Sequence, residues 1–299
     1  MAEWIWQRLV RGCRRVWQHD DWARVLPADW VERIMTVDVT DRFHAKQGRS
    51  TGRWIVENER GKLAVYLKRH YRLPWWQGLL AALWPSGGWS PAEQERRRLA
   101  WAAQHGLQVP RVMASAEFIG PGAQLQSVLA VEELAGMLPL NEAIPLAAKR
   151  KGRREFEQWK RGLTLEVARL TKILHRQRHF HKDLYLCHFY IPEAFTRTMP
   201  TWTDQVYMID FHRLAAHPFT WPVWQVKDLA ELLYSSAVEG VGPRDRLRFW
   251  RHFLAERSGM AASLLRLLIL AKWRRYRTHN AKRQSRAKAI SPLPSKRSA

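Results

Sequence analysis

The chain has 299 residues and a formal net charge of +23, because 50 lysines and arginines outnumber 27 acids. This length suffices for one domain with two lobes and a substantial core. Two cysteines are too few for a disulfide framework or a zinc site. The positive charge indicates a polyanionic neighbour, either nucleic acid or an anionic membrane.

The first 35 residues are rich in arginine and tryptophan. We expect residues 1–35 to form an amphipathic helical extension, because Trp6, Val10, Cys13 and Trp17 recur with arginines between them. Such a helix lies either on a membrane surface or against the protein core. Since no apolar run of suitable length precedes a small-residue cleavage site, the sequence predicts no secretory signal.

A strand that carries a lysine follows. The segment LAVYLKRHY alternates apolar and polar residues, which is typical of a half-buried strand, and Lys68 lies near its end, as the phosphate-binding lysine does in kinase-like strands. Before it, KQGRSTGRW contains Gly48 and Gly52 and loosely matches a glycine-rich phosphate loop. An ordinary solvated lysine is the alternative interpretation of Lys68.

Tryptophan and leucine dominate residues 73–89, which read LPWWQGLLAALWPSGGW. Indole is amphipathic and favours the interface between membrane and water. The stretch is shorter than the roughly 20 apolar residues needed to cross a bilayer. We therefore expect it either to lie in the headgroup region of a membrane or to pack against the core.

A capped helix comes next, in SPAEQERRRLAWAAQHG. Ser90 is its expected N-cap, Pro91 lies in its first turn, and Gly106 ends it. Glu95 on this helix is the candidate partner that orients Lys68 toward nucleotide phosphates, and an ordinary solvated ion pair is the alternative. The following strand, SVLAVEEL, leads toward a hinge.

These elements predict an α+β, bilobal, protein-kinase-like fold. Residues 36–135 are expected to form a small lobe with an antiparallel sheet and the capped helix, and residues 136–276 a larger helical lobe. In that lobe, FEQWKRGLTLEVARLTKILHRQR has the spacing of a core helix. Residues 277–299 form a basic tail with too few apolar residues to fold, which we expect to be disordered.

Two acids mark the chemistry of the larger lobe. The segment from His181 to His188 reads HKDLYLCH, and 22 residues later MIDFHR carries Asp210. In a kinase-like catalytic loop, Asp183 would accept the proton of the attacking hydroxyl, while His188, five positions on, would face metal and phosphates. Since magnesium prefers oxygen ligands, His188 suits a phosphate or a metal-bound water better than direct ligation. Asp210 closes an apolar run and is the candidate magnesium ligand.

The segments FHKDLYLCHFYI, YMIDFHRL and KDLAELLYSS together resemble the Kdo/WaaP lipopolysaccharide kinase family, bacterial enzymes with a protein-kinase-like fold. The similarity runs from about residue 46 to about residue 253. It implies an ATP- and Mg²⁺-dependent phosphotransferase that acts on a sugar hydroxyl of the lipopolysaccharide inner core, typically of a heptose. This would occur on the cytoplasmic face of the inner membrane.

The resemblance also implies roles for individual residues. Asp183 would be the catalytic base, Asp210 the magnesium ligand, Lys68 the phosphate-binding lysine and Glu95 its partner. Backbone groups at Glu132 and Leu134 would meet adenine at the hinge. His181 would support the catalytic loop by hydrogen bonding, and Lys182 stands where many kinases have arginine.

The expected partners are the lipopolysaccharide core and lipid A glycolipid, which carries phosphates and carboxylates, and the anionic inner-membrane surface. Two other functions remain open. One is a membrane-associated pseudokinase or adaptor, suggested by the loose glycine-rich loop and by His188. The other is a basic nucleic-acid-binding protein whose tryptophans stack on bases. Since the sequence contains no recognisable nucleic-acid module, no nucleic-acid partner is expected.

Overall fold

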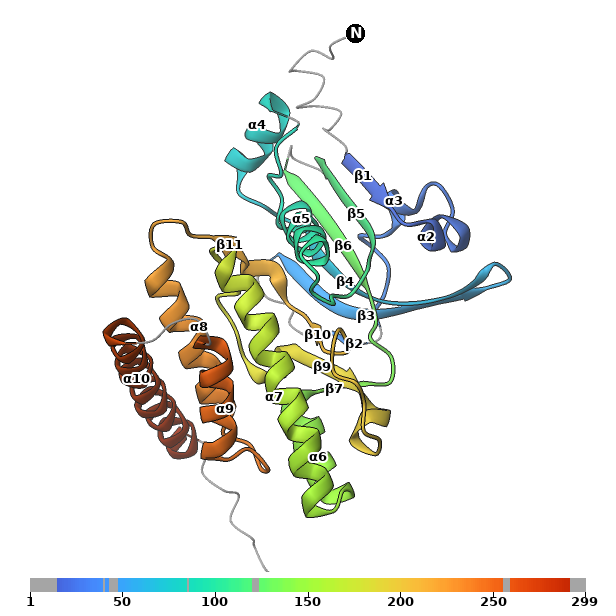
Figure 1. Ribbon diagram of the computed structural model, residues 1–299. Helices are drawn as coiled ribbons and strands as arrows, with labels where there is room; N and C mark the ends of the chain where they lie inside the picture. Colours follow the sequence, from blue (N-terminus) through green and yellow to red (C-terminus); the bar gives the residue numbers. More distant parts are fainter. Residues whose placement is uncertain are drawn as a thin grey trace, which may run out of the picture. The chain divides into compact units, whose positions relative to one another are not determined.

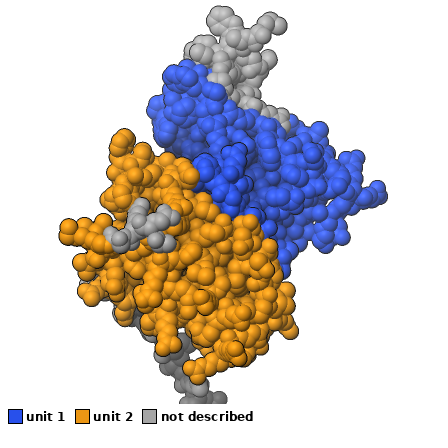
Figure 2. All heavy atoms as spheres, in the orientation of Figure 1, with its two compact units in different colours: residues 1–137, 207–213 blue, residues 138–206, 214–299 orange. Residues whose placement is uncertain are grey.

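The structure is a computed structural model and describes residues 15–39, 41–42, 48–84, 86–119, 124–254 and 259–290. The chain divides into two compact units (Figure 2). Unit 1 comprises residues 1–137 and 207–213, and unit 2 comprises residues 138–206 and 214–299. The short segment that carries Asp210 therefore belongs to unit 1, although unit 2 flanks it on both sides in the sequence.

Unit 1 is built on a six-stranded sheet with the order β1-β5-β6-β4-β3-β2 (Figure 1). All neighbouring strands are antiparallel, and a two-residue turn at residues 59–60 joins β3 to β4 in a register that pairs Thr51 with Lys68. The strands of this sheet are β1 (Arg15–Gln18), β2 (Asp41–Arg42), β3 (Arg49–Asn58), β4 (Gly61–His70), β5 (Val112–Ile119) and β6 (Leu125–Glu132).

Alternation along β4 decides which way its lysine points. Val65 and Leu67 are buried in a core with the tryptophans of α2 (Asp20–Val25) and α3 (Trp30–Arg33). Because successive side chains of a strand point to opposite faces, Lys68 points to the other face, where α5 packs on β4 and β6.

Helix α5 (Pro91–Gln104) begins and ends where the sequence predicts. The hydroxyl of Ser90 accepts a hydrogen bond from the backbone N–H of Glu93, which caps the helix. Gly106, just beyond its end, has a φ of +76°, the left-handed conformation that glycine adopts without strain. Between β4 and α5 the chain forms α4 (Trp75–Leu83).

The N-terminal segment differs from the predicted helical extension. Arg15–Gln18 is strand β1, paired with β5 at the edge of the sheet, and α2 and α3 are short. Val16 and Trp17 suit a strand, and pairing with β5 satisfies backbone groups that a helix would have satisfied internally. The rest of the predicted amphipathic helix, residues 1–14, lies outside the described residues.

Unit 2 is mostly helical. As predicted, α7 is a core helix, with Phe156, Trp159, Leu163 and Leu170 buried along one face. Helix α9 packs along α7, and α10 packs along α8. The helices are α6 (Leu140–Arg150), α7 (Arg153–Arg176), α8 (Trp221–Ser235), α9 (Pro243–Leu254) and α10 (Met260–Ile290).

Short elements surround the catalytic-loop sequence. In unit 2, β8 pairs antiparallel with β11, and η2 forms one turn of 3₁₀ helix at the end of the loop. The short elements are β7 (Met137–Pro139), β8 (His179–Phe180), η2 (Leu186–His188), β9 (Phe189–Pro192), η3 (Glu193–Thr196) and β11 (Ala215–Ala216), with β10 (Tyr207–Met208) and η4 (Phe211–Arg213) in unit 1.

The basic tail begins as helix, contrary to the predicted disorder from residue 277. Helix α10 continues to Ile290. Alanine, lysine, arginine and glutamine are strong helix formers, and a helix already nucleated by packing on α8 extends at little cost. Residues 291–299 lie outside the described residues. Within the described chain, no helix combines the length and the apolar character that crossing a membrane requires.

Candidate active site

Unit 1 places one cation between two acids. The Nζ atom of Lys68 lies 2.5 Å from Oε1 of Glu95 and 3.8 Å from Oδ1 of Asp210. Glu95 is almost buried, whereas Lys68 and Asp210 keep 21% and 31% of their side chains exposed. The structure thus brings together three residues that the sequence proposes for phosphate and metal binding, and it leaves the lysine and Asp210 accessible.

The neighbourhood of Asp210 explains how it reaches Lys68. The backbone N–H of Met208 donates to the carbonyl of Gln108 at 2.8 Å, and Phe211 is fully buried. Arg98 on α5 donates to the carbonyl of His212. Asp210 itself has a φ of +67°, a left-handed conformation that aspartate tolerates better than most residues. Its Oδ1 also lies 2.6 Å from Nδ1 of His212.

Glu93, two residues before Glu95, points elsewhere. This buried carboxylate pairs with Arg15, Arg96 and Arg97. Burial raises the pKa of Glu93, but hydrogen bonds from Arg96 and Arg97 outweigh that effect and leave the pKa below its ordinary value. Glu93 is thus committed to these arginines, and Glu95 is the acid of α5 that meets Lys68.

The two glycines of the predicted phosphate loop lie in different secondary structure. Gly48 has a φ of +78° and lies just before β3, and residues 43–47 of the loop are outside the described residues. Gly52 corrects the prediction, because it lies within β3, paired with Arg42 of β2 and Leu67 of β4. The segment RSTGR is rich in small and polar residues, which favour loops, and it is a strand because β2 and β4 pair with it. Phosphate contact by Gly48 stays a prediction.

The two residues proposed for the hinge, Glu132 and Leu134, lie at the end of β6 and just after it. The carboxylate of Glu132 accepts hydrogen bonds from the backbone N–H and the Nε of Arg111, at 2.8 and 2.7 Å. The carbonyl of Leu134 accepts from the N–H of Met137 in a turn that contains Gly136 at a φ of +69°. The side chain of Glu132 therefore fastens β6 to the chain before β5. Adenine binding at Glu132 and Leu134 stays a prediction.

In unit 2, one face of α8 holds the catalytic loop by its main chain. Asp228, fully buried, accepts the backbone N–H groups of His181 and Lys182, both at 2.9 Å, and its Oδ2 lies 3.3 Å from Nε2 of His175. Further along the helix, Glu231 accepts the N–H of Leu184, and Ser235 Oγ accepts the N–H of Leu186 at 2.8 Å. The two ends of the loop around Asp183 are thereby fixed.

Lys227, also on α8, reaches the proposed base. Its Nζ lies 3.8 Å from Oδ1 of Asp183 and 2.5 Å from Oε1 of Glu231, and it donates to the carbonyl of Lys182. Burial raises the pKa of Glu231, although Lys227 opposes that shift. Burial, and then the charge of Glu231, raise the pKa of the Tyr185 hydroxyl. The ammonium of Lys227 thus connects the carboxylate of Asp183 to Glu231 and to the carbonyl of Lys182.

The remaining loop residues proposed from the sequence have defined places in unit 2. His181 is fully buried, and its backbone N–H donates to Asp228, while support of the loop by its side chain stays a prediction. The ammonium of Lys182 lies 4.5 Å from the ring centroid of Trp224, while its backbone adopts a φ of +68°. His188 Nδ1 lies 2.7 Å from the carbonyl of Asp183. Contact of His188 with metal or phosphate stays a prediction.

Sequence reasoning missed Asp228, Glu231, Ser235 and Lys227 as residues of the site. A signal was present, since KDLAELLYSS places polar residues three and four positions apart on an otherwise apolar helix. That spacing puts them on one face. What the sequence could not show is that this face meets the main chain of the catalytic loop.

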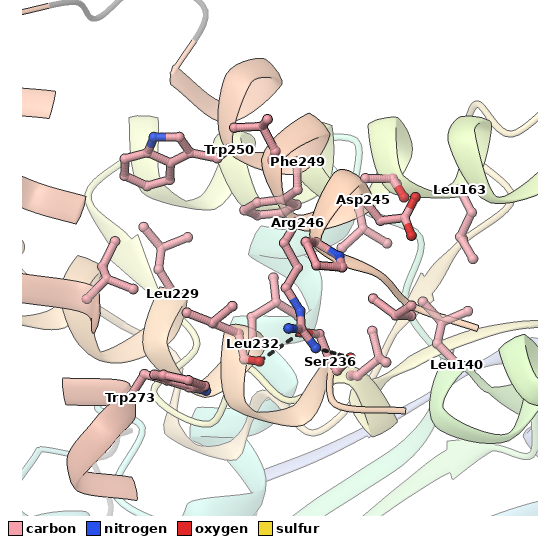
Figure 3. A pocket seen from close by; sticks show the side chains of 18 of the residues that line it. Leu140, Leu163, Leu229, Leu232, Ser236, Asp245, Arg246, Phe249, Trp250 and Trp273 are labelled. Atoms are coloured by element: carbon pink, nitrogen blue, oxygen red, sulfur yellow. Dashed lines mark hydrogen bonds between the residues drawn. The ribbon is translucent and has the colours of Figure 1, made fainter. Parts of the chain in front are cut away.

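Unit 2 also contains an apolar cavity of about 400 Å³, partly open to solvent, among α6, α7, α8, α9 and α10 (Figure 3). Arg246 crosses its wall and donates to the hydroxyl and carbonyl of Ser236. At its edge, Lys160 and Asp245 form a buried ion pair at 2.9 Å. The apolar lining includes Leu140, Leu163, Leu229, Leu232, Phe249, Trp250 and Trp273.

The residues of unit 1 fit a nucleotide with a hard cation. Among the described residues, no group of three or more histidines, cysteines and acids could hold a metal ion by itself. Magnesium is commonly bound by one or two carboxylates together with substrate phosphates rather than by an all-protein cage. Asp210 supplies such a carboxylate, and Lys68 supplies the ammonium that phosphates require.

A lysine on β4, its acid partner on α5, and a second acid after the short strand β10 define a protein-kinase-like phosphotransferase. The whole fold agrees. The solved structure titled "WaaP in complex with acyl carrier protein" superimposes with a TM-score of 0.62 at 25% identity, covering 88% of this chain and 97% of that one. The predicted α+β, protein-kinase-like fold is confirmed.

Sequence comparison places the chain more narrowly. The model of the lipopolysaccharide kinase (Kdo/WaaP) family matches residues 38–253, and the chain belongs to this family. It is 29% identical over 216 residues to the lipopolysaccharide core heptose(I) kinase WaaP of Pseudomonas aeruginosa, covering 71% of this chain and 75% of that protein. It is 33% identical over 92 residues to WaaP of Escherichia coli K12, covering 31% and 34%. The expected family and the expectation of a kinase are confirmed.

Proposed function

We propose that this enzyme transfers the γ-phosphoryl group of ATP to a heptose hydroxyl of the lipopolysaccharide inner core. The observation that carries the proposal is the position of Lys68 between Glu95 and Asp210 in unit 1. The names of the relatives, lipopolysaccharide core heptose(I) kinase, support the choice of sugar.

Each residue has a role in this proposal. Asp210 would hold Mg²⁺, which would neutralise the charge of the ATP phosphates, and ATP would supply the phosphoryl group. Lys68, oriented by Glu95, binds phosphate oxygens. Asp183 orients the acceptor hydroxyl and takes its proton late in the transfer, so that catalysis is mainly positioning and electrostatics. Lys227 holds the carboxylate of Asp183 and the carbonyl of Lys182 in place.

We propose that the enzyme acts on the cytoplasmic face of the inner membrane as a peripheral protein. ATP is available on that side, and the acceptor is a glycolipid. The net charge of +23 supports attraction both to the phosphates of the lipopolysaccharide core and lipid A and to an anionic bilayer.

An acyl carrier protein is a second proposed partner. The similar solved structure is of WaaP in complex with acyl carrier protein, and the apolar cavity of unit 2 offers room for an apolar chain. Leu232→Trp, which would fill part of the cavity, is expected to reduce co-purification of acyl carrier protein. Leu79→Trp on α4 of unit 1 is the matched control. Equal recovery with both variants would contradict a role for the cavity.

The reaction is tested with labelled ATP, magnesium and dephosphorylated lipopolysaccharide core, followed by mapping of the labelled sugar. Asp183→Asn removes the proton acceptor while preserving shape, and we expect at least about a 10³-fold loss of turnover. Asp204→Asn, an exposed aspartate of the same unit, should leave turnover unchanged. A wild type that binds ATP but phosphorylates no core would favour a pseudokinase, and label on protein instead of glycan would refute the proposed acceptor.

A further inference from the structure

We propose that α4 and the loop after it, residues 75–84 and 86–89, form a docking surface for the anionic headgroup region of a phospholipid membrane. The inference rests on the proposed function, since it names the surface by which the enzyme reaches a membrane-borne acceptor. Figure 1 shows α4 at one end of unit 1. We call residues 75–84 of this segment the tryptophan face.

Helix α4 differs from an ordinary surface helix in which side chains it buries and which it exposes. It buries its small residues, Gly78, Ala81 and Ala82, against unit 1. Its large apolar residues point to solvent: Trp75 is 72% exposed, Trp84 just after it 57%, and Trp76, Leu79 and Leu83 are also exposed. Positions 75, 79 and 83 recur every four residues and Trp76 adjoins them, so these side chains form one contiguous face.

The side-chain types favour a lipid interface as the occupant of this face. Indole has a large apolar body and one polar N–H, and it concentrates at the level of the lipid headgroups. Nine residues are too few to cross a bilayer, but they can lie flat in its surface. Helix α4 contains no charged residue, so its apolar face can enter the interface without burying a charge.

The charges around the tryptophan face match an anionic surface. Arg72 just before the helix is exposed. After the helix, Arg97 donates to the carbonyl of Ser86 and Arg15 to the carbonyl of Gly87. The acid that these arginines share with Arg96, Glu93, is only 3% exposed. Arg96 and Arg97 thus share one buried acid, and together with the exposed Arg72 they bring positive charge that attracts anionic headgroups.

The surface is also held in shape before any lipid binds. The indole N–H of Trp89 donates to the carbonyl of Trp84 at 2.7 Å, and the side chain of Gln94 donates to the carbonyl of Gly88. These bonds fix the loop against the start of α5. A surface that is already ordered loses little conformational freedom on docking, which favours binding.

Flotation of the full-length protein with vesicles tests the proposal. Wild type should float with vesicles of phosphatidylethanolamine and phosphatidylglycerol, and much less with phosphatidylcholine alone. The double variant Trp75→Ser/Trp76→Ser should lower the partition coefficient on the order of 100-fold, because two exposed indoles no longer transfer out of water. A second double variant, Leu79→Ser/Leu83→Ser, should weaken flotation in the same direction.

The matched control is Phe219→Ser/Val223→Ser, which removes two exposed apolar residues of unit 2 and should float like wild type. Thermal midpoints confirm that all variants fold. Flotation unchanged in both α4 variants, or no flotation of wild type, would overturn the proposal. So would a lipid-free dimer that dissociates in the Trp75→Ser/Trp76→Ser variant, since the occupant would then be a second copy of the chain.

Activity separates this proposal from the proposed function. The Trp75→Ser/Trp76→Ser variant should phosphorylate soluble, deacylated core as wild type does, but lose activity on lipopolysaccharide embedded in vesicles. If wild type phosphorylates neither acceptor, the proposed function fails while flotation still decides the docking surface. If the variant retains full activity on embedded acceptor and floats normally, the docking surface fails while the kinase stands.

Discussion

The proposed phosphate-binding lysine of unit 1 and the proposed base of unit 2 are held in place by different means. In unit 1, Lys68 is positioned by direct pairing with the side chains of Glu95 and Asp210. In unit 2, Asp183 is positioned through the main chain of its loop, which bonds to Asp228, Glu231 and Ser235 of α8.

This difference predicts which substitutions change turnover alone and which also change the stability of the fold. A side chain held by another side chain loses its position when either partner is changed, but the surrounding sheet remains. A loop held by its backbone depends on the buried acids that accept its N–H groups, and a buried donor without an acceptor is costly. Substitutions in the Lys68 pair should therefore change turnover more than folding, and substitutions on α8 should change folding as well.

The largest of these effects is expected for Asp228→Ala. The substitution leaves the backbone N–H groups of His181 and Lys182 and the ring of His175 without their buried acceptor, at a cost of about 3 kcal/mol in the free energy of unfolding. Urea denaturation measures it. Glu239→Ala, at an exposed glutamate of the same unit, should change the free energy by less than about 0.5 kcal/mol. Equal values for the two variants would show that α8 does not hold the loop.

Lys68→Met should lower turnover about 100-fold, since it removes the cation that neutralises phosphate charge in the transition state. Lys62→Met is a close control, because Lys62 lies on the same strand and forms an exposed pair with Glu57. The measurement is kcat for core phosphorylation, with the unfolding midpoint as a check on folding. If Lys62→Met and Lys68→Met lose activity equally, the loss reflects the removal of a surface charge and not the specific position of Lys68.

Lys227→Met should reduce kcat about tenfold, the size expected when a positioning residue beside the base is lost. KM and the pH profile of kcat distinguish a positioning role from a folding defect. A misfolded fraction would lower the amount of active enzyme, but it would leave KM and the shape of the pH profile unchanged. Lys227→Arg, which keeps the charge, should restore part of the activity. An unchanged kcat in Lys227→Met would assign the residue to structure alone.

The smallest effect concerns His70 in unit 1. Burial, and then the charges of Arg49 and Lys68, lower the pKa of His70 from 6.5 to about 4. The folded protein thus keeps this imidazole neutral, while the unfolded chain takes up a proton below pH 6.5. The stability contributed by neutral His70 is complete above pH 6.5 and is lost as the pH falls toward about 4.

Allowing for solvent screening of this half-buried side chain, the loss is about 1 kcal/mol. Urea unfolding of wild type and His70→Gln, followed from neutral pH to about pH 4.5, measures it. The variant should show a flatter pH dependence, whereas His279→Gln, at an exposed position, should follow wild type. Parallel curves for wild type and His70→Gln would exclude His70 as the origin of the slope.

Much of unit 1 was predictable because its signals are local. Ser90, Pro91 and Gly106 mark the ends of α5, and alternation in β4 orients Lys68. The kinase-like motif pattern singled out Glu95 as the partner of Lys68, and the structure pairs the two. The N-terminal strand β1 was not predictable in the same way, since Arg15–Gln18 is a strand only because the edge of β5 is available to pair with it.

The sequence by itself determined the family, the kinase-like fold and the candidate residues for its chemistry, because caps, hydrophobic periods and short catalytic motifs are local properties of the chain. Only the tertiary structure decided that Asp210 joins unit 1, that α8 holds the catalytic loop, and that α4 exposes its tryptophans. Each of these depends on which surfaces distant segments bury against one another. A sequence pattern shows whether a face is polar or apolar, but not which other segment or surface will pack against it.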